Sequence, residues 1–222
     1  MKNNCVYPIW KPPGISSYDV IRELKKYLNE KTKLGHCGTL DPFAEGVLIV
    51  CADDELKNVS NYMSLTKKYT TDIIFGKETD TLDPTGKIIN TSKENDMINI
   101  ENIKNIMDQL MIEYKQSPPY YSAKKINGIR LYKLARKNIY IKPKGSNVKI
   151  HSYNLNKLKN DFLQIEVSCS AGLYIRSLAR DIAQKLNTYA YVDKLTRDSV
   201  GSFTKDNSIN FYRIKECCLS IN

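Results

Sequence analysis

The longest apolar run in this chain of 222 residues covers only positions 47–52. A helix that crosses a membrane needs about 20 consecutive apolar residues, so this run is too short to span a bilayer. The run is rich in β-branched residues and therefore indicates a buried strand. Hydrophobic residues make up 41% of the sequence, and a chain of this length can enclose a sizeable core. No signal-type apolar segment follows Met1. We expect a cytoplasmic protein with no membrane contact.

The cysteines and histidines do not have the spacing of a metal site. The sequence holds two histidines and six cysteines, without a Cys-x-x-Cys pair: Cys5, Cys37, Cys51, Cys169, Cys217 and Cys218. Neither a zinc site nor a disulfide framework is indicated, and reduced thiols are expected. The sequence also lacks the phosphate-binding loop, the dinucleotide-binding turn, the HExxH motif and the serine-hydrolase elbow. We therefore expect no cofactor and no metal.

Strand-like and helix-like patterns mix along the chain without the regular alternation of a doubly wound sheet. Strands are expected at residues 6–10, 47–51, 69–75, 148–158 and 162–171, and helices at 17–28, about 56–63, 103–111, 130–137 and 175–186. Ser16 and Asp19 form a capping-box pattern before the first helix. Loops are expected at 35–46 and 79–86, and a hairpin turn at 159–161. These patterns predict an α+β fold. Since no linker or repeat is present, a single domain is expected.

The positive charge is concentrated in one segment. The chain carries 34 basic and 24 acidic side chains, which gives a formal net charge of +10. Residues 114–160 contain twelve of the basic side chains, six tyrosines and no acidic residue, so the rest of the chain has 34 − 12 = 22 basic against 24 acidic groups. Cations interleaved with aromatic rings suit a phosphate backbone and unstacked bases. A solvated basic face is the alternative, but the composition favours a nucleic-acid partner.

A glycine-rich loop at residues 35–46 presents one carboxylate, that of Asp41. Glycines allow a ligand to approach the backbone closely, and Pro42 restricts the chain directly after the acid. Local rules by themselves favour a turn-capping role for Asp41. They leave a functional role open.

The run GHCGTLDPFAEGVL at positions 35–48 resembles the signature loop of the TruB family of tRNA pseudouridine synthases, whose Asp is the catalytic residue. Further motifs of that family follow in order. They are WKPPGISS at 10–17, KKY at 67–69 with FGKETDTLDPTG at 75–86, PPYYSAK at 118–124 with GIRLYKLAR at 128–136, CSAGLYIRSL at 169–178 and LTR at 195–197. The resemblance covers residues 6–203, which is most of the chain.

The resemblance implies a mixed, mainly antiparallel sheet flanked by helices, in a single catalytic domain over residues 1–222 with a thumb insertion at about 115–142. It implies that the enzyme isomerises the uridine at position 55 in the T-loop of tRNA. The implied roles of individual residues are as follows: Asp41 is catalytic, Arg176 pairs with it, Tyr69 stacks on the uracil and assists at C5, His36 holds the RNA loop, Leu195 lines the base pocket, and Lys124, Lys125, Arg130 and Tyr174 contact RNA. Lys11 and Pro12 are expected to support the catalytic loop.

The chemistry of pseudouridine formation accounts for these residue types. The reaction breaks the C1′–N1 bond, turns the uracil and rejoins it through C5, so nothing is oxidised and no cofactor is required. An ionised carboxylate is needed at the ribose, as nucleophile or as base, and the sequence leaves both roles open. A nearby arginine favours the ionised form. Extracting the uridine from its stack costs a few kcal/mol, which a stacking Tyr69 offsets in part. Alternatively, Tyr69 and Leu195 are core residues and Arg176 is a surface cation.

Bacterial members of the family often carry a C-terminal RNA-binding domain of the PUA type. Only about 18 residues follow Thr204 here, so no such domain is expected. Catalytic subunits of guide-RNA particles share the motifs but normally retain that domain, which favours a stand-alone enzyme. We expect a monomer that binds the T-arm of tRNA and has no obligate protein partner. The rival hypothesis is an RNA-binding or tRNA-folding module without turnover, for which basic charge and stacking tyrosines suffice.

Overall fold

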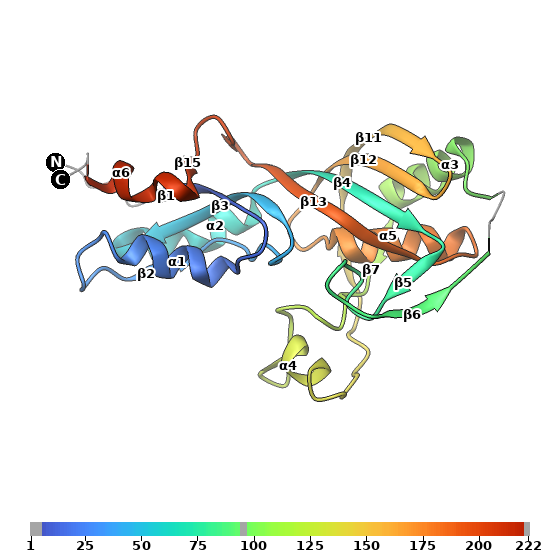
Figure 1. Ribbon diagram of the computed structural model, residues 1–222, viewed down its shortest axis with the longest axis horizontal. Coiled ribbons are helices and arrows are strands. Elements are labelled where there is room, and N and C mark those ends of the chain that lie inside the picture. Colours follow the sequence, from blue (N-terminus) through green and yellow to red (C-terminus); the bar gives the residue numbers. More distant parts are fainter. Residues whose placement is uncertain (1–5, 94–96, 220–222) are drawn as a thin grey trace. The chain divides into compact units, whose positions relative to one another are not determined.

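The computed structural model describes residues 6–93 and 97–219, and the side chains of the last two of these are not described. Contacts divide the chain into two compact units, one formed by residues 1–69 with 195–222 and the other by residues 70–194. Strands β4 (Lys67–Phe75) and β13 (Ala190–Val200) contribute residues to both units (Figure 1). The single domain expected from the sequence stays a prediction. Cys37 and Cys51 are buried free thiols, whereas Cys5 and the side chain of Cys218 lie outside the described part.

The first unit is built around the eight-residue strand β3 (Glu45–Ala52). In this unit the strand order is β13-β3-β1-β15, with β2 also paired to β3 and β14 to β13. The β1–β3 pair is antiparallel, whereas β3–β13 and β1–β15 are parallel. The other elements of this unit are β1 (Val6–Lys11), α1 (Ser17–Lys25), β2 (Leu34–His36), η1 (Asp53–Asn58), α2 (Val59–Ser64), β14 (Phe203–Thr204), β15 (Ile209–Asn210), η2 (Phe211–Arg213) and α6 (Ile214–Leu219).

Strand β3 is buried on both faces, which explains its unbroken apolar sequence. Leu48 and Val50 pack with Val20 and Leu24 of α1 on one side. The alternate residues of the strand, including Ile49, form a second cluster against η1 and α2. Because each face of a strand takes every second residue, covering both faces requires apolar residues throughout.

The second unit contains the sheet order β11-β12-β4-β13, covered by helices. Helix α3 buries the stripe Ile103, Ile106, Met107 and Leu110, and it contacts both β11 and α5. The elements of this unit are β5 (Lys77–Thr79), β6 (Ile88–Thr91), α3 (Ile100–Ile112), β7 (Tyr114–Gln116), β8 (Lys125–Ile126), β9 (Ile129–Arg130), α4 (Leu131–Ala135), β10 (Ser146–Val148), β11 (Ile150–Lys159), β12 (Phe162–Cys169) and α5 (Ile175–Lys185). β11 and β12 form the expected hairpin, and Asn160 at its turn has φ of 53°.

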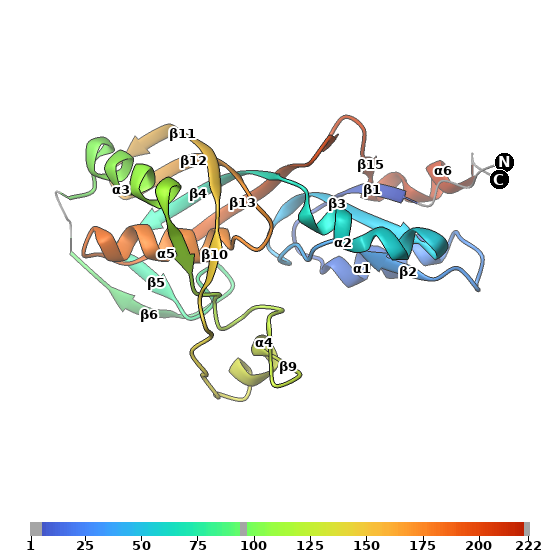
Figure 2. The ribbon, with the colours of Figure 1, turned by 180° about the vertical axis from the view of Figure 1, so that it is seen from behind.

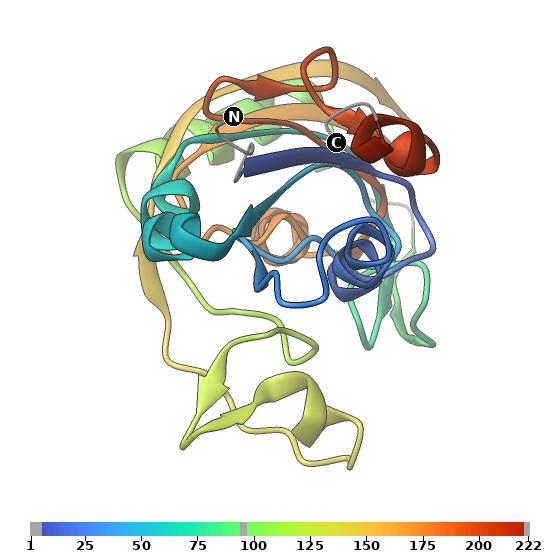
Figure 3. The ribbon, with the colours of Figure 1, turned by 90° about the vertical axis from the view of Figure 1, so that its left-hand side faces the viewer.

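A thumb segment, residues 117–145, leaves the second unit between β7 and β10. These two short strands pair antiparallel, so both ends of the thumb segment start from one two-stranded root. Figures 2 and 3 show the segment with α4 near its tip, directed away from α3 and α5. Its bounds overlap those of the thumb insertion predicted at about 115–142, and the role of the segment as an RNA-binding thumb stays a prediction.

The α+β fold with a mixed, mainly antiparallel sheet is confirmed. The capping box at Ser16 and Asp19 is also present, although α1 ends at Lys25 and not at residue 28. The predicted loop at 35–46 is wrong at its margins, because residues 34–36 form β2 and residue 45 already belongs to β3. Among residues 6–93 and 97–219, no helix is both long and apolar enough to cross a membrane.

Candidate active site

Asp41 lies in a loop of the first unit whose backbone is fixed on both sides of the acid. On one side, the Ser17 hydroxyl donates to the carbonyl of Leu40 at 3.0 Å and accepts from its N–H at 2.9 Å. On the other side, the N–H of Gly14 donates to the carbonyl of Pro42 at 2.7 Å. The acid itself is partly exposed. The two motifs at residues 10–17 and 35–48 are therefore one structure, in which the first holds the second.

Lys11 adds a buried cation beneath this loop. Its Nζ donates to the carbonyls of Pro12 at 2.8 Å, Ile15 at 2.9 Å and Pro42 at 3.4 Å, and the residue has no exposed surface. Burial is the main cause that lowers the pKa of Lys11 from 10.5 to about 8, while the nearby Asp41 charge acts in the opposite direction. Lys11 thus supports the loop around Asp41 through the Pro42 carbonyl, whereas the support expected from Pro12 stays a prediction.

Arg197 holds the loop from a third direction. This arginine of β13 is only 2% exposed, and its guanidinium donates to the carbonyls of Val47 at 2.7 Å, Gly38 at 3.3 Å and Thr39 at 3.5 Å. Its backbone lies against Gly46, where an added Cβ would come within 2.3 Å of the Arg197 carbonyl oxygen. Gly46 also has φ of 124°, which side chains rarely allow. Glycine is thus required at position 46 for two independent reasons.

The other predicted site residues of the first unit occupy strands. His36 ends β2, pairs with Val50 and is partly exposed. Tyr69 in β4 is 9% exposed and Leu195 in β13 is 6% exposed. Burial of this degree agrees with a wall of a base pocket and equally with a core position, so the roles of these two residues stay predictions.

Arg176 belongs to the second unit and is almost completely buried, at 3% exposure. The surface-cation alternative is therefore wrong. Its Nη1 lies 3.3 Å from Oδ2 of Asp83 and donates to the Thr81 carbonyl at 2.8 Å, and its Nη2 donates to the Tyr121 carbonyl at 3.0 Å. Its pairing with Asp41 is untested and stays a prediction.

Asp83 is a residue of this site that sequence reasoning missed. It is 6% exposed, and its other oxygen accepts from the hydroxyls of Thr81 and Thr85 at 2.7 and 2.5 Å and from the Thr85 N–H at 3.0 Å. These bonds fix the carboxylate in the turn of the TDTLDPTG run. The recurrence of Thr and Asp in this run was the available signal, but only the fold shows that the turn faces Arg176.

The predicted RNA-contacting cations lie in the thumb segment and are exposed. Lys124 directly precedes β8, Lys125 is the first residue of β8, and Arg130 ends β9 directly before α4. Tyr174 is partly exposed and lies at the N-cap position of α5, two residues before Arg176. These residues are thus wholly or partly exposed, and their contacts with RNA stay predictions.

Two comparisons with known proteins decide the family. Residues 25–175 match the model of the TruB family pseudouridylate synthase N-terminal domain. A "tRNA pseudouridine synthase B" of Clostridium tetani is 41% identical over 215 residues, which is 96% of this chain and 73% of that protein. The enzyme of the same name from Fusobacterium nucleatum is 43% identical over 199 residues, covering 87% of this chain and 67% of the relative. The chain belongs to the TruB family.

Solved structures share the fold. A chain of a Cbf5-Nop10-Gar1 complex matches 95% of this TruB-family chain with a TM-score of 0.70 and 24% identity. A chain of an H/ACA RNP bound to a substrate RNA matches with a TM-score of 0.67 and 21% identity. This chain spans only about half the length of these two solved chains, 53% and 52%. At such identities the likeness supports the fold alone.

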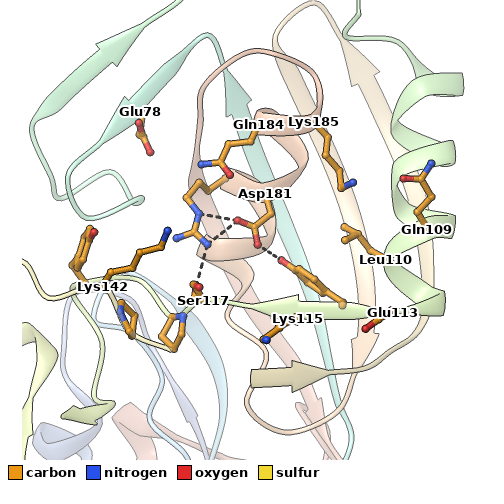
Figure 4. A pocket seen from close by; sticks show the side chains of 15 residues that line it. Glu78, Gln109, Leu110, Glu113, Lys115, Ser117, Lys142, Asp181, Gln184 and Lys185 are labelled. Atoms are coloured by element: carbon orange, nitrogen blue, oxygen red, sulfur yellow. Dashed lines mark hydrogen bonds and ion pairs between the residues drawn. The ribbon is translucent and has the colours of Figure 1, made fainter. Parts of the chain in front are cut away.

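The second unit of this TruB-family protein contains a cavity of about 760 Å³ (Figure 4). It is bordered by α3, α5, β7 and both ends of the thumb segment. Arg180 and Asp181 on its wall form an ion pair of 2.7 Å. The cavity lining includes Lys115, Tyr120 and Lys142 of the basic segment, but not the predicted catalytic residues Asp41, Tyr69 and Arg176.

Proposed function

We propose that this protein is a tRNA pseudouridine synthase that isomerises the T-loop uridine at position 55, with Asp41 as its catalytic residue. The observation that carries the proposal is the fixed loop around Asp41. Hydrogen bonds hold the backbone directly before and directly after this acid, while the acid itself remains partly exposed. A carboxylate held in this way is preorganised to meet the ribose C1′ of an extracted nucleotide.

Family membership supports the same assignment. The relatives that cover this chain at about 40% identity are named tRNA pseudouridine synthase B. The reaction exchanges one glycosidic bond for another within the nucleotide, so it can run with side chains alone. Asp41 then acts at the sugar as nucleophile or as base.

Arg176 and Tyr69 complete the proposed catalytic set. The Arg176 guanidinium is preorganised by Asp83 and by two carbonyls, so little ordering remains when it meets a second carboxylate. We propose that this second carboxylate is Asp41, and that Tyr69 stacks on the extracted uracil. His36 and Leu195 would shape the base pocket around them.

The thumb segment supplies the binding of the T-arm in this proposal. Lys124, Lys125 and Arg130 are exposed and lie in a stretch of the chain without any acidic residue. Such charges attract a phosphate backbone through release of counterions. We further propose that the enzyme acts as a cytoplasmic monomer without an obligate protein partner.

The decisive test compares wild type with Asp41→Asn on a tRNA transcript labelled at uridine. We expect wild type to form pseudouridine at position 55 and the variant to form none above background, while both bind the transcript with similar affinity. Asp54→Asn is the matched control, because Asp54 is an acid of the same unit whose side chain is 93% exposed. Binding without turnover by wild type would establish the RNA-binding module instead.

A further inference from the structure

The start of α5, which carries Arg176, is held by a side chain from a different element. Helix α5 has Tyr174 at its N-cap position, and the Tyr174 side chain makes no capping hydrogen bond. Gln116 of β7 bonds there instead. Its Oε1 accepts from the Tyr174 N–H at 2.7 Å, and its Nε2 donates to the Tyr174 carbonyl at 3.1 Å. One amide group therefore bonds both backbone groups of the residue at which the helix begins.

Gln116 is itself held rigidly. The residue is 1% exposed, and Nε2 also donates to the hydroxyl oxygen of Tyr114 at 2.8 Å. That hydroxyl in turn donates to Asp181 of α5 at 2.7 Å. Burial and the adjacent Asp181 charge raise the pKa of Tyr114, so the hydroxyl stays protonated and keeps donating. The orientation of the Gln116 amide is thus determined by a network of buried hydrogen bonds.

The same segment is the root of the thumb. The Ser117 carbonyl, one residue after Gln116, accepts from the Ser177 hydroxyl at 2.9 Å and from Arg180 at 3.0 Å. Further along, the Tyr121 carbonyl accepts from Arg176 itself. The first turns of α5 are therefore bonded to Gln116 at the end of β7 and to the first residues of the thumb segment.

We propose that Gln116 is a positioning residue for the reaction: it fixes the first turn of α5, and with it the Arg176 guanidinium, relative to the root of the thumb. This inference rests on the proposed function, because it requires Arg176 to act in catalysis. Gln116 bonds to the backbone of Tyr174 and touches no substrate in this proposal. Its effect is transmitted only through the placement of Arg176.

Gln116→Met tests this proposal. Met has a volume similar to that of Gln, but its side chain can make neither of the two hydrogen bonds to the backbone of Tyr174. A displacement of a catalytic group by about 1 Å can lower a rate about 100-fold. We therefore expect the kcat of Gln116→Met for a T-arm hairpin to fall by about 100-fold, with KM changed less than about threefold. Gln109→Met, an exposed glutamine of α3 in the same unit, is the matched control and should leave both constants unchanged.

A double-mutant cycle separates positioning from general destabilisation. If Gln116 acts through Arg176, adding Gln116→Met to Arg176→Lys should lower the single-turnover rate by less than about threefold. If Gln116→Met lowers the single-turnover rate of the Arg176→Lys variant as much as it lowers that of wild type, the inference is overturned. The assays are run at least 10 °C below the unfolding midpoint of each variant, measured by circular dichroism.

Gln116→Glu is the second variant, in case Gln116→Met does not fold. Its carboxylate can still accept from the Tyr174 N–H but cannot donate to the Tyr174 carbonyl, so an intermediate loss of kcat is expected. A kcat equal to that of wild type contradicts the inference. If wild type forms no pseudouridine, the proposed function fails. If wild type is active and the cycle is additive, only the role of Gln116 fails.

Discussion

Two groups of positively charged side chains in this molecule differ in their burial and in their hydrogen-bond partners. Lys11 and Arg197 are buried, at 0% and 2% exposure, and each donates to backbone carbonyls around the Asp41 loop. Lys124, Lys125 and Arg130 in the thumb segment are exposed. The first group has exchanged its hydration for backbone carbonyls and so contributes to the structure. The second group keeps its hydration until an anionic partner replaces it.

The difference shows that a count of charges cannot assign a role to a cation. A buried cation fixes the backbone that it bonds, since leaving the carbonyls without a donor is costly. An exposed cation contributes little to stability but acts over the Debye length on a charged ligand. Replacing members of the two groups should therefore affect different measurements.

The largest effect is expected from Arg197→Met. The substitution removes the donors of three carbonyls and leaves part of the loop without hydrogen bonds, which costs about 3 kcal/mol or more of unfolding free energy. Arg130→Met in the thumb segment should change the unfolding free energy by less than about 0.5 kcal/mol. Urea unfolding followed by circular dichroism measures both, and equal losses for the two variants would remove the distinction between the groups.

The contrast between local patterns and tertiary contacts also explains how much of the fold could be predicted from the sequence. Residues within one helix or strand gave reliable signals, such as the capping box before α1 and the apolar stripe of α3. The long strand β13 was not predicted, because its polar residues include Asp193, Lys194 and Arg197, which obscure the strand pattern. Arg197 is buried only because β13 pairs with β3, and the sequence carries no local sign of that pairing.

The residues of the candidate site also differ in whether a local sequence pattern predicts them. The family resemblance predicted Asp41, Tyr69 and Arg176, because each lies in a recognisable motif. Asp83 and Gln116 were missed as functional residues. Their roles depend on contacts with residues far away in the chain, Arg176 for Asp83 and Tyr174 for Gln116. Such contacts follow from tertiary packing, which no local pattern encodes.

A smaller effect on stability, but a clear one on binding, is expected in the thumb segment. Replacing Lys124, Lys125 and Arg130 together by glutamine should weaken binding of a T-arm hairpin and flatten its dependence on salt. Each neutralised contact lowers the slope of log affinity against log salt by about 0.7 to 0.9, so a change of about 2 to 3 is expected. Fluorescence anisotropy between 50 and 300 mM salt measures the slope.

The control for this experiment neutralises Lys149, Lys157 and Lys159, which are equally exposed but lie outside the thumb segment. Its slope should remain near that of wild type. If both triple variants change the slope equally, net charge and not the thumb segment governs binding. An unchanged slope in the thumb variant would exclude the segment from the interface.

The last prediction concerns the pH dependence of stability, and it tests whether the Lys11 amine is buried. The pKa of Lys11 is lowered by burial from 10.5 to about 8 in the folded protein. Between about pH 8 and pH 10.5, the unfolded chain therefore binds more protons at this position than the folded one. The unfolding free energy contributed by Lys11 must then rise with pH across this window.

Lys11→Arg and Lys11→Met lack this titration, because arginine stays charged and methionine carries no charge throughout. The difference in unfolding free energy between wild type and either variant should grow in favour of wild type from pH 8 to pH 10. Subtracting the variant curve cancels the other groups that titrate at alkaline pH, such as exposed tyrosines. Lys124→Met, which removes an exposed lysine, should give a curve parallel to that of wild type over the same range. Parallel curves for the Lys11 variants as well would mean that Lys11 titrates as a hydrated amine, and its assignment to the buried group of cations would be wrong.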